Sequence, residues 1–189
     1  MKFSTTVKYG LPAAFILLIA VVLHYNLPRT QVMQIIGTDV KRLDSADKGK
    51  ADGAEQVQGK EGVVASRDVR FINAVSQSGK AEVFRNEDTG WGWPPYFKFN
   101  SADITAQAQS FTTAKEKTWI LVKYYGWRIH IFDIFPNVIS LKQVPRDYTN
   151  IPWFNIVFLG LLGAGGYYAV RRFRRLIQRF KARFSKNKF

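Results

Sequence analysis

A stretch of twenty residues without formal charge lies at residues 151–170, which read IPWFNIVFLGLLGAGGYYAV. A helix of this length, with a rise of about 1.5 Å per residue, covers a hydrocarbon core about 30 Å thick. A second apolar stretch, residues 11–27, follows a short polar N-terminus, and its Pro12 is tolerated in a first helical turn. The pattern therefore predicts two transmembrane helices, at residues 11–27 and 151–170.

The first of these stretches also has the layout of a secretory signal peptide, which is the alternative interpretation. A signal peptide ends in a small-x-small cleavage site, but this apolar run ends in the residues HYNL at 24–27. We therefore expect an anchor that stays attached to the mature protein.

Between the two spans, apolar and polar positions alternate over short segments, which is typical of strands that bury one face. Gly37 predicts a kink or bulge in the first strand, and Gly126 predicts a tight bend in a later one. The turn composition of residues 77–80 predicts a hairpin. The expected strands are residues 29–43, 66–76, 81–85, 118–125, 127–135 and 138–144.

One short helix is expected inside this domain, at residues 101–113. Ile104, Ala108 and Phe111 recur at helical spacing, and Ser101 is suited to cap the helix. The fold class predicted is an α+β membrane protein. Two transmembrane helices flank a small antiparallel domain, either barrel-like or a curled sheet, and a basic amphipathic helix follows at the C-terminus.

Residues 44–62 contain four glycines, mixed charges and almost no apolar side chains, so we expect a mobile loop. An acidic metal-binding loop is the alternative for this segment, and its interleaved lysines argue against that alternative.

The net charge of +14 is unevenly distributed along the chain. Residues 171–189 contribute +9 without a single acid, whereas residues 28–150 contribute only +3. Cations gather at the cytoplasmic ends of membrane spans. We therefore expect residues 1–10 and 171–189 in the cytoplasm and residues 28–150 on the far side of the membrane. The nearly balanced domain argues against a nucleic-acid partner.

The C-terminal tail alternates cations with apolar residues at intervals of three and four, which predicts an amphipathic helix on an anionic lipid surface. Small residues in the preceding span would let another helix approach closely, so a membrane-protein partner or a homo-oligomer is expected. The candidate lipid contacts are Arg171, Arg172, Arg174, Arg175 and Arg179, and the candidate helix-packing residues are Gly160, Gly163 and Ala164.

Residues 85–103 are the most distinctive part of the domain, because positions 91–99 hold five aromatic residues. We consider that they plug an open end of the β domain, form a binding surface, or insert at the membrane interface. The plug is the favoured interpretation. The candidate partner or ligand surface comprises Arg85, Asp88, Trp91, Trp93, Tyr96 and Arg128.

The chemistry available to the chain is limited. It has no cysteine, and its two histidines, His24 and His130, are far apart, so we expect no metal and no cofactor. An enzyme would need Arg85, Glu87, Asp88, Arg128 and His130 to converge on a cleft, and no nucleophile–base spacing supports this. A non-enzymatic protein is expected.

Several motifs resemble those of an uncharacterised bacterial inner-membrane family, known as domain of unknown function 1523. They are GTDVKR at 37–42, SRDVRFINAV at 66–75, RNEDTGWGWPPYFKFNSADITAQAQ at 85–109, KYYGWRI at 123–129 and IPWFNI at 151–156. The resemblance covers nearly the whole chain and implies a periplasmic domain with two spans, but it implies no activity and no site residues.

The function expected is therefore that of an accessory or scaffolding subunit of an envelope or membrane complex. The alternative is a periplasmic ligand-binding or sensing module that uses the aromatic residues 91–99, and the least favoured is a hydrolytic enzyme.

Overall fold

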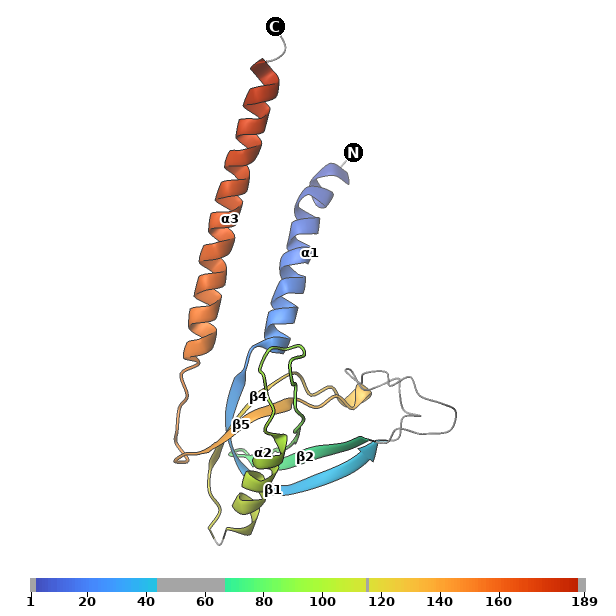
Figure 1. The fold of residues 1–189 in the computed structure, drawn as a ribbon, viewed down its shortest axis with the longest axis vertical. Helices are drawn as coiled ribbons and strands as arrows, with labels where there is room; N and C mark the ends of the chain where they lie inside the picture. Colours follow the sequence, from blue (N-terminus) through green and yellow to red (C-terminus); the bar gives the residue numbers. More distant parts are fainter. Residues whose placement is uncertain (1–2, 44–66, 115, 187–189) are drawn as a thin grey trace, which may run out of the picture. The chain divides into compact units, whose positions relative to one another are not determined.

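The computed structural model describes residues 3–43, 67–114 and 116–186 (Figure 1). The expected mobile loop at residues 44–62 lies outside this range. The chain divides into two compact units, Met1–Asn150 and Ile151–Phe189. The first contains α1 (Phe3–Asn26), β1 (Arg29–Leu43), β2 (Arg67–Ser76), β3 (Ala81–Arg85), α2 (Ser101–Thr113), β4 (Ile120–Tyr125), the 3-10 helix η2 (His130–Phe132) and β5 (Asn137–Gln143), and the second contains α3 (Trp153–Lys186).

The five strands close into a barrel in the order β1-β2-β3-β5-β4, so the sequence-based expectation of a small barrel is confirmed. Four of the neighbouring pairs are antiparallel, as expected. The pair that joins β3 to β5 is instead parallel and consists of Arg85 opposite Asn137. The barrel is therefore not purely antiparallel.

The bulge expected at Gly37 is present in β1, where the register with β2 shifts between Ile35 and Gly37. An extra residue in one strand bends it and increases its twist, which helps a small sheet to close. The shift leaves Ile36 exposed, while Ile35 stays in the core. The apolar interior consists of Met33, Ile35, Ile72, Ala74, Phe84, Ile104, Ala108, Ile120, Val122, Val138 and Leu141.

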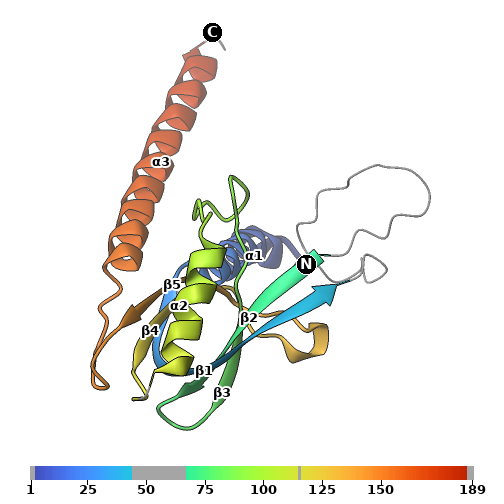
Figure 2. The same ribbon diagram turned by 60° about the horizontal axis from the view of Figure 1, so that its bottom comes forward.

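The helix α2 covers the barrel, as Figure 2 shows. Its Ile104 and Ala108 are buried in the core, and Phe111 packs against the same cluster, which confirms the helical spacing expected for residues 101–113. The helix thus fills the role that the sequence assigned to the aromatic loop. The favoured interpretation of residues 91–99 as a plug is wrong, because four of their five aromatic side chains are exposed.

Residues 127–135 do not form the strand that their alternation predicts. They make a tight excursion with one isolated bridge between Ile129 and Ile134 and the 3-10 helix η2 at its tip. Gly126 at φ +90° begins the excursion, and Asp133 at φ +48° turns it back. Ile131, at the tip of this excursion, is 87% exposed.

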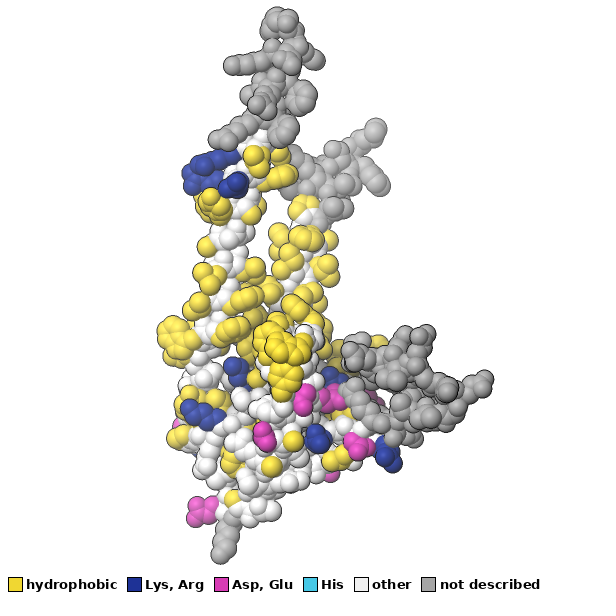
Figure 3. All heavy atoms as spheres, viewed as in Figure 1, with side chains coloured by type: hydrophobic (Ala, Val, Ile, Leu, Met, Phe, Trp, Pro, Cys, Tyr) yellow, Lys and Arg dark blue, Asp and Glu magenta, His cyan; other side chains and the backbone are white. Residues whose placement is uncertain are grey.

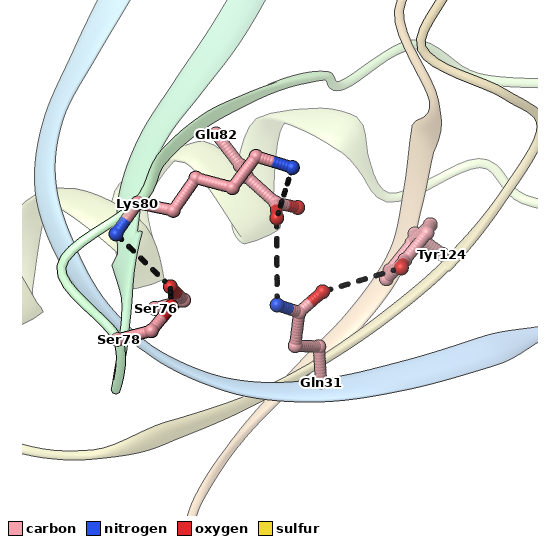
Figure 4. Close-up of polar contacts among 6 residues, drawn as sticks. All are labelled: Gln31, Ser76, Ser78, Lys80, Glu82 and Tyr124. Carbon is pink, nitrogen blue, oxygen red and sulfur yellow. Dashed lines mark hydrogen bonds and ion pairs between the residues drawn. The ribbon is translucent and has the colours of Figure 1, made fainter.

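A row of half-buried polar side chains lies beside the apolar core (Figure 4). Tyr124 donates a hydrogen bond to Gln31 at 3.4 Å, and Gln31 donates to Glu82 at 3.5 Å. The row thereby joins β4, β1 and β3, and Lys80 balances the charge of Glu82 at 3.6 Å. Burial raises the pKa of Tyr124, so its hydroxyl stays a donor.

The end of α1 is fixed to the barrel by several contacts. Gly126 donates its backbone N–H to the Tyr25 carbonyl at 3.0 Å, and the Tyr96 hydroxyl donates to the Asn26 carbonyl. The last carbonyls of a helix have no partner within it, so these two donors satisfy groups that would otherwise need water. The Trp127 indole also donates to His24 at 2.8 Å.

The helix α3 is a single helix of 34 residues, so the expected span and the expected basic tail helix form one continuous element. Among the described residues, its segment Trp153–Gln178 is the one helix long and apolar enough to cross a membrane, which is weak evidence of membrane association. Pro12–Asn26 within α1 is a shorter apolar helix.

Candidate functional site

A cavity of about 430 Å³ lies where four strands and the start of α2 meet. The residues that line it are mostly polar, because the segment that leaves β3 carries the sequence RNEDT across this end of the barrel. The lining residues are Asp68, Arg70, Arg85, Asn86, Glu87, Asp88, Thr89, Gly92, Trp93, Ser101, Tyr125 and Asn137.

Asn137 holds one wall of this cavity together. Its amide nitrogen donates to the Glu87 carbonyl at 3.0 Å and to the Tyr125 hydroxyl at 3.1 Å. Its amide oxygen accepts the backbone N–H of Glu87 at 3.0 Å. A buried amide is stable only when its donors and acceptor are paired, and here the pairing fixes the path of the chain after β3.

Asp88 fixes the start of α2 on the opposite side. Its carboxylate accepts the backbone N–H of Ser101 at 2.9 Å and the Ser101 hydroxyl at 2.7 Å. Ser101, which the sequence offered as a cap, is instead the first helical residue, and the preceding Asn100 makes no side-chain cap. A carboxylate at a helix N-terminus is favoured by the helix dipole.

Charged side chains of both signs face the cavity. Arg85 pairs with Glu87 at 2.8 Å, and Arg70 donates to the Ser101 hydroxyl at 3.3 Å. A cavity that combines guanidinium and carboxylate groups suits a small ligand that carries charge of both signs. In this structure these charged groups pair with one another and with Ser101.

Lys98 is buried, with 4% of its surface exposed, and contacts the cavity residue Asn86. Its amine donates to the Asn86 side-chain oxygen at 2.5 Å, and the Asn86 amide donates to the Ser101 carbonyl at 2.8 Å. Burial lowers the pKa of Lys98 to about 8, against the opposing effect of Asp88 and Glu87. The amine therefore titrates close to physiological pH.

The aromatic residues of the loop 91–99 separate into one inward and four outward side chains. Tyr96 stacks on Tyr125 with ring centroids 4.8 Å apart, and burial raises the pKa of the Tyr96 hydroxyl. The ring of Trp91 contacts those of Phe97 and Phe99, with ring centroids 5.5 and 5.6 Å apart. The exposed fractions are 84% for Trp91, 75% for Trp93, 54% for Phe97 and 57% for Phe99.

The structure brings together only part of the candidate surface expected from the sequence. Arg85, Asp88 and Trp93 line the cavity, whereas Trp91, Tyr96 and Arg128 are not among its lining residues. Arg128 lies 3.8 Å from the ring centre of Phe135 and donates to the Ile134 carbonyl at 3.1 Å.

Only three of the five residues considered for an enzyme line the cavity. These are Arg85, Glu87 and Asp88, whereas Arg128 and the exposed His130 are not among the lining residues. Among residues 3–43, 67–114 and 116–186, no three His, Cys, Asp or Glu side chains are placed to hold a metal ion.

The candidate residues on α3 are described by themselves. Gly160, Gly163 and Ala164 are exposed, and a side chain added at either glycine would meet nothing within 4 Å. Figure 3 shows dark-blue side chains gathered toward the C-terminal end of the helix. Arg171, Arg172, Arg174 and Arg175 are exposed, and the side chain of Arg179 lies outside the described part.

Sequence reasoning missed three buried polar residues of the site, Asn86, Lys98 and Asn137, and assigned Ser101 only as a helix cap. Their burial depends on contacts between segments 12 to 50 residues apart, which no local pattern reports. Two prolines before Lys98 and a run of polar residues around Asn86 were the only local signals of an ordered loop.

Fold and site together define a small α+β protein in which an N-terminal helix leads into a five-stranded closed barrel with a polar cavity, and a long apolar helix follows. The chain belongs to the family described as "Protein of unknown function (DUF1523)", whose model matches residues 5–177. This confirms the family resemblance noted in the sequence.

An uncharacterised protein of Haemophilus influenzae is similar to this chain. The two are 37% identical over 146 residues, which cover 73% of this chain and 76% of the relative. No solved structure matches the chain. The family and the relative carry no stated activity, so the function has to be argued from the site.

Proposed function

We propose that this protein is a non-enzymatic accessory or scaffolding subunit of the bacterial inner membrane. In this proposal α1 and α3 both cross the membrane, both termini are cytoplasmic, and the barrel domain lies in the periplasm. The excess of cations after residue 170 supports this orientation.

The observation that carries the proposal is the fixed junction between α1 and the barrel. Three segments hold the last turn of α1: β1 continues from it, Gly126 donates to Tyr25, and Tyr96 donates to Asn26. A domain on a flexible linker would sample many orientations, whereas this junction presents the barrel at one angle to its helix. A fixed presentation suits a subunit that positions a partner.

Protease accessibility tests the orientation. Protease added to intact spheroplasts should cut the barrel domain and leave a tag fused after Phe189 intact, and inverted vesicles should show the opposite pattern. The reverse result in both preparations would contradict the proposal. Crosslinking in native membranes followed by mass spectrometry should then recover a larger membrane complex, and a protein that stays monomeric after mild solubilisation would argue against scaffolding.

The alternative function is ligand binding or sensing, and the polar cavity favours it. Arg70, Arg85 and Trp93 line this cavity, which has the volume of a small-molecule site. A small zwitterionic ligand should raise the thermal midpoint of the full chain in detergent, and Arg70→Gln should remove that shift. A panel of amino acids and short peptides without any effect would dismiss this alternative.

A further inference from the structure

Four large aromatic side chains of one loop are held outside the protein. Trp91, Trp93, Phe97 and Phe99 are each more than half exposed, and they follow one another within nine residues. An isolated exposed apolar residue is ordinary, but a contiguous group of this kind marks a surface that contacts a partner or a membrane.

The loop that carries them is ordered by polar contacts from its own backbone and by two inward residues. Gly90 donates its N–H to the Lys98 carbonyl at 3.1 Å, and Lys98 donates its N–H to the Thr89 hydroxyl at 3.2 Å. The buried amine of Lys98 and the stacked ring of Tyr96 hold the loop to the barrel. The exposed rings are therefore presented by a rigid support.

The position of the loop is fixed by α1. Tyr96 lies in the middle of the aromatic segment, and its hydroxyl is bonded to the carbonyl of Asn26, the last residue of α1. Figure 1 shows the loop rising beside this end of the helix. If α1 crosses a bilayer, its end at Tyr25 and Asn26 marks the outer boundary, so Tyr96 in the middle of the aromatic loop lies at that depth.

We propose that the exposed aromatic side chains of residues 91–99 insert into the interfacial region of the lipid bilayer at the outer end of α1. This proposal rests on the membrane anchoring proposed above. Trp rings prefer the boundary between headgroups and acyl chains because they combine a large apolar area with one polar N–H. The insertion gives the barrel a point of contact with the membrane besides α1.

Lipid fits this surface better than a small ligand does. Three of the four exposed rings, at Trp91, Phe97 and Phe99, are not among the residues that line the cavity, so they form a projection and not a pocket. The ring of Trp91 contacts those of Phe97 and Phe99, which keeps the three together as one apolar surface, and Tyr96 of the same loop is bonded to the last residue of α1. The apolar side chains of α1 are exposed as well, so a lipid environment suits both segments.

Single spin labels test the insertion. The chain contains no cysteine, so one cysteine creates a unique labelling site without any other change. We would label Trp91→Cys and Phe99→Cys in the loop, Leu162→Cys in α3, and Ser110→Cys on the exposed side of α2 as a matched control. The full chain is placed in vesicles of phosphatidylethanolamine and phosphatidylglycerol, and the collision rates of each label with oxygen and with a water-soluble nickel complex are compared.

Labels at positions 91 and 99 should show an oxygen-to-nickel ratio several-fold above that at position 110 and below that at position 162. If position 162 is oxygen-rich while 91 and 99 match 110, the anchoring stands and the insertion is overturned. If position 162 also matches 110, α3 does not cross the bilayer and both proposals are overturned. Two loop positions are labelled so that one misfolded variant leaves the other to decide.

A protein occupant gives a different result. Labels at 91 and 99 that stay exposed to nickel in lipid vesicles, but become immobile in native membrane vesicles, would identify a protein partner and overturn the lipid proposal. As a second measurement, the double variant Trp91→Ser with Trp93→Ser should lower the oxygen-to-nickel ratio at position 99 toward the value at 110. An unchanged ratio would also overturn the proposal.

Discussion

The hydroxyl group of Tyr96 donates a hydrogen bond to the backbone carbonyl of Asn26, 70 residues earlier in the chain. The same ring stacks on Tyr125, whose hydroxyl accepts the Asn137 amide. One side chain thus connects the end of α1, the aromatic loop, β4 and the wall of the polar cavity. Changes at Tyr96 should affect all four.

Replacing Tyr96 with phenylalanine should destabilise the protein by about 1 kcal/mol, because it removes one buried hydrogen bond and keeps the stacked ring. Thermal unfolding of the full chain in detergent, followed by circular dichroism, measures this change. Tyr148→Phe removes the hydroxyl of a residue that is 38% exposed and is the matched control. Equal shifts for the two variants would show that the bond to Asn26 contributes nothing.

Replacing Asp88 with alanine should destabilise the protein by about 2–3 kcal/mol, because two hydrogen bonds to a carboxylate are lost at the start of α2. Asp103→Ala removes the same charge from the first turn of α2, where the side chain is exposed. That control should cost below about 1 kcal/mol, which is the size of a helix-dipole interaction. Chemical unfolding measures the free energy of unfolding of both variants. A larger loss of stability for Asp103→Ala than for Asp88→Ala would contradict the role of Asp88 at the start of α2.

The strands, the short helix and the bulge were predictable because they depend on local patterns. Gly37 interrupts an alternating run, and Ile104 and Ala108 recur at helical spacing, so both signals lie within a few residues of the feature they indicate. The strand predicted for residues 127–135 was wrong, because apolar and polar residues alternate there but the backbone is not extended. Two residues with positive φ, Gly126 and Asp133, turn it back before a strand can pair.

The site was harder to predict than the fold. Aromatic composition indicated that residues 91–99 are special, but composition does not distinguish a ring that fills a core from one that is held outside. The direction of Trp91 depends on where Tyr96 and Lys98 find partners, and these lie 70 and 12 residues away. The cavity depends likewise on Asn137, which pairs with Glu87, 50 residues earlier in the chain.

The stability of the protein should rise as pH increases from about 8 toward 10. The pKa of Lys98 is lowered by burial from 10.5 to about 8, so over this range the unfolded state binds more protons than the folded state. Below pH 8 the amine is charged in both states and the gain is absent. Each pKa unit is worth about 1.4 kcal/mol, so a gain of about 2–3 kcal/mol is expected.

Buried tyrosines limit that gain at higher pH. Burial raises the pKa of Tyr124 and Tyr125 above the ordinary value of 10.0, so the folded state keeps protons that the unfolded state loses, and stability falls above pH 10. Thermal midpoints across this range measure both effects. The variant Lys98→Met should lack the rise between pH 8 and 10, and a rise that persists in this variant would assign it to another group.

Replacing Gly126 with alanine should destabilise the protein by about 1–3 kcal/mol. Gly126 has φ +90°, and a Cβ there would lie 3.5 Å from Pro136 and 3.8 Å from the Tyr25 ring. Gly37→Ala is the control, since its Cβ would meet only the Asn73 amide at 3.7 Å and its φ is not positive. The thermal midpoint of Gly126→Ala should lie well below that of Gly37→Ala. The reverse order would show that the backbone of Gly126 does not require a glycine.

Neutralising the cations that follow residue 170 should weaken control of membrane orientation. We expect the variant in which Arg171, Arg172, Arg174 and Arg175 become glutamine to give a mixed population of C-termini on both sides. A reporter fused after Phe189 measures the cytoplasmic fraction, and exchange of the same four residues for lysine is the control that keeps the charge. A fully cytoplasmic reporter in the glutamine variant would assign orientation to another part of the chain.

The barrel is joined unevenly around its circumference. β1 and β2 are paired along ten positions, whereas β3 and β5 share one backbone pair, Arg85 with Asn137. Arg85 donates its N–H to the Pro136 carbonyl at 2.8 Å, and the Asn137 side chain bonds the backbone of Glu87 beside it. A local opening that separates β3 from β5 would break few backbone hydrogen bonds and would keep the β1–β2 pairing intact. Arg85 and Asn137 also line the polar cavity. Separation of β3 from β5 would therefore enlarge the cavity and let it admit a ligand larger than its volume in the closed barrel.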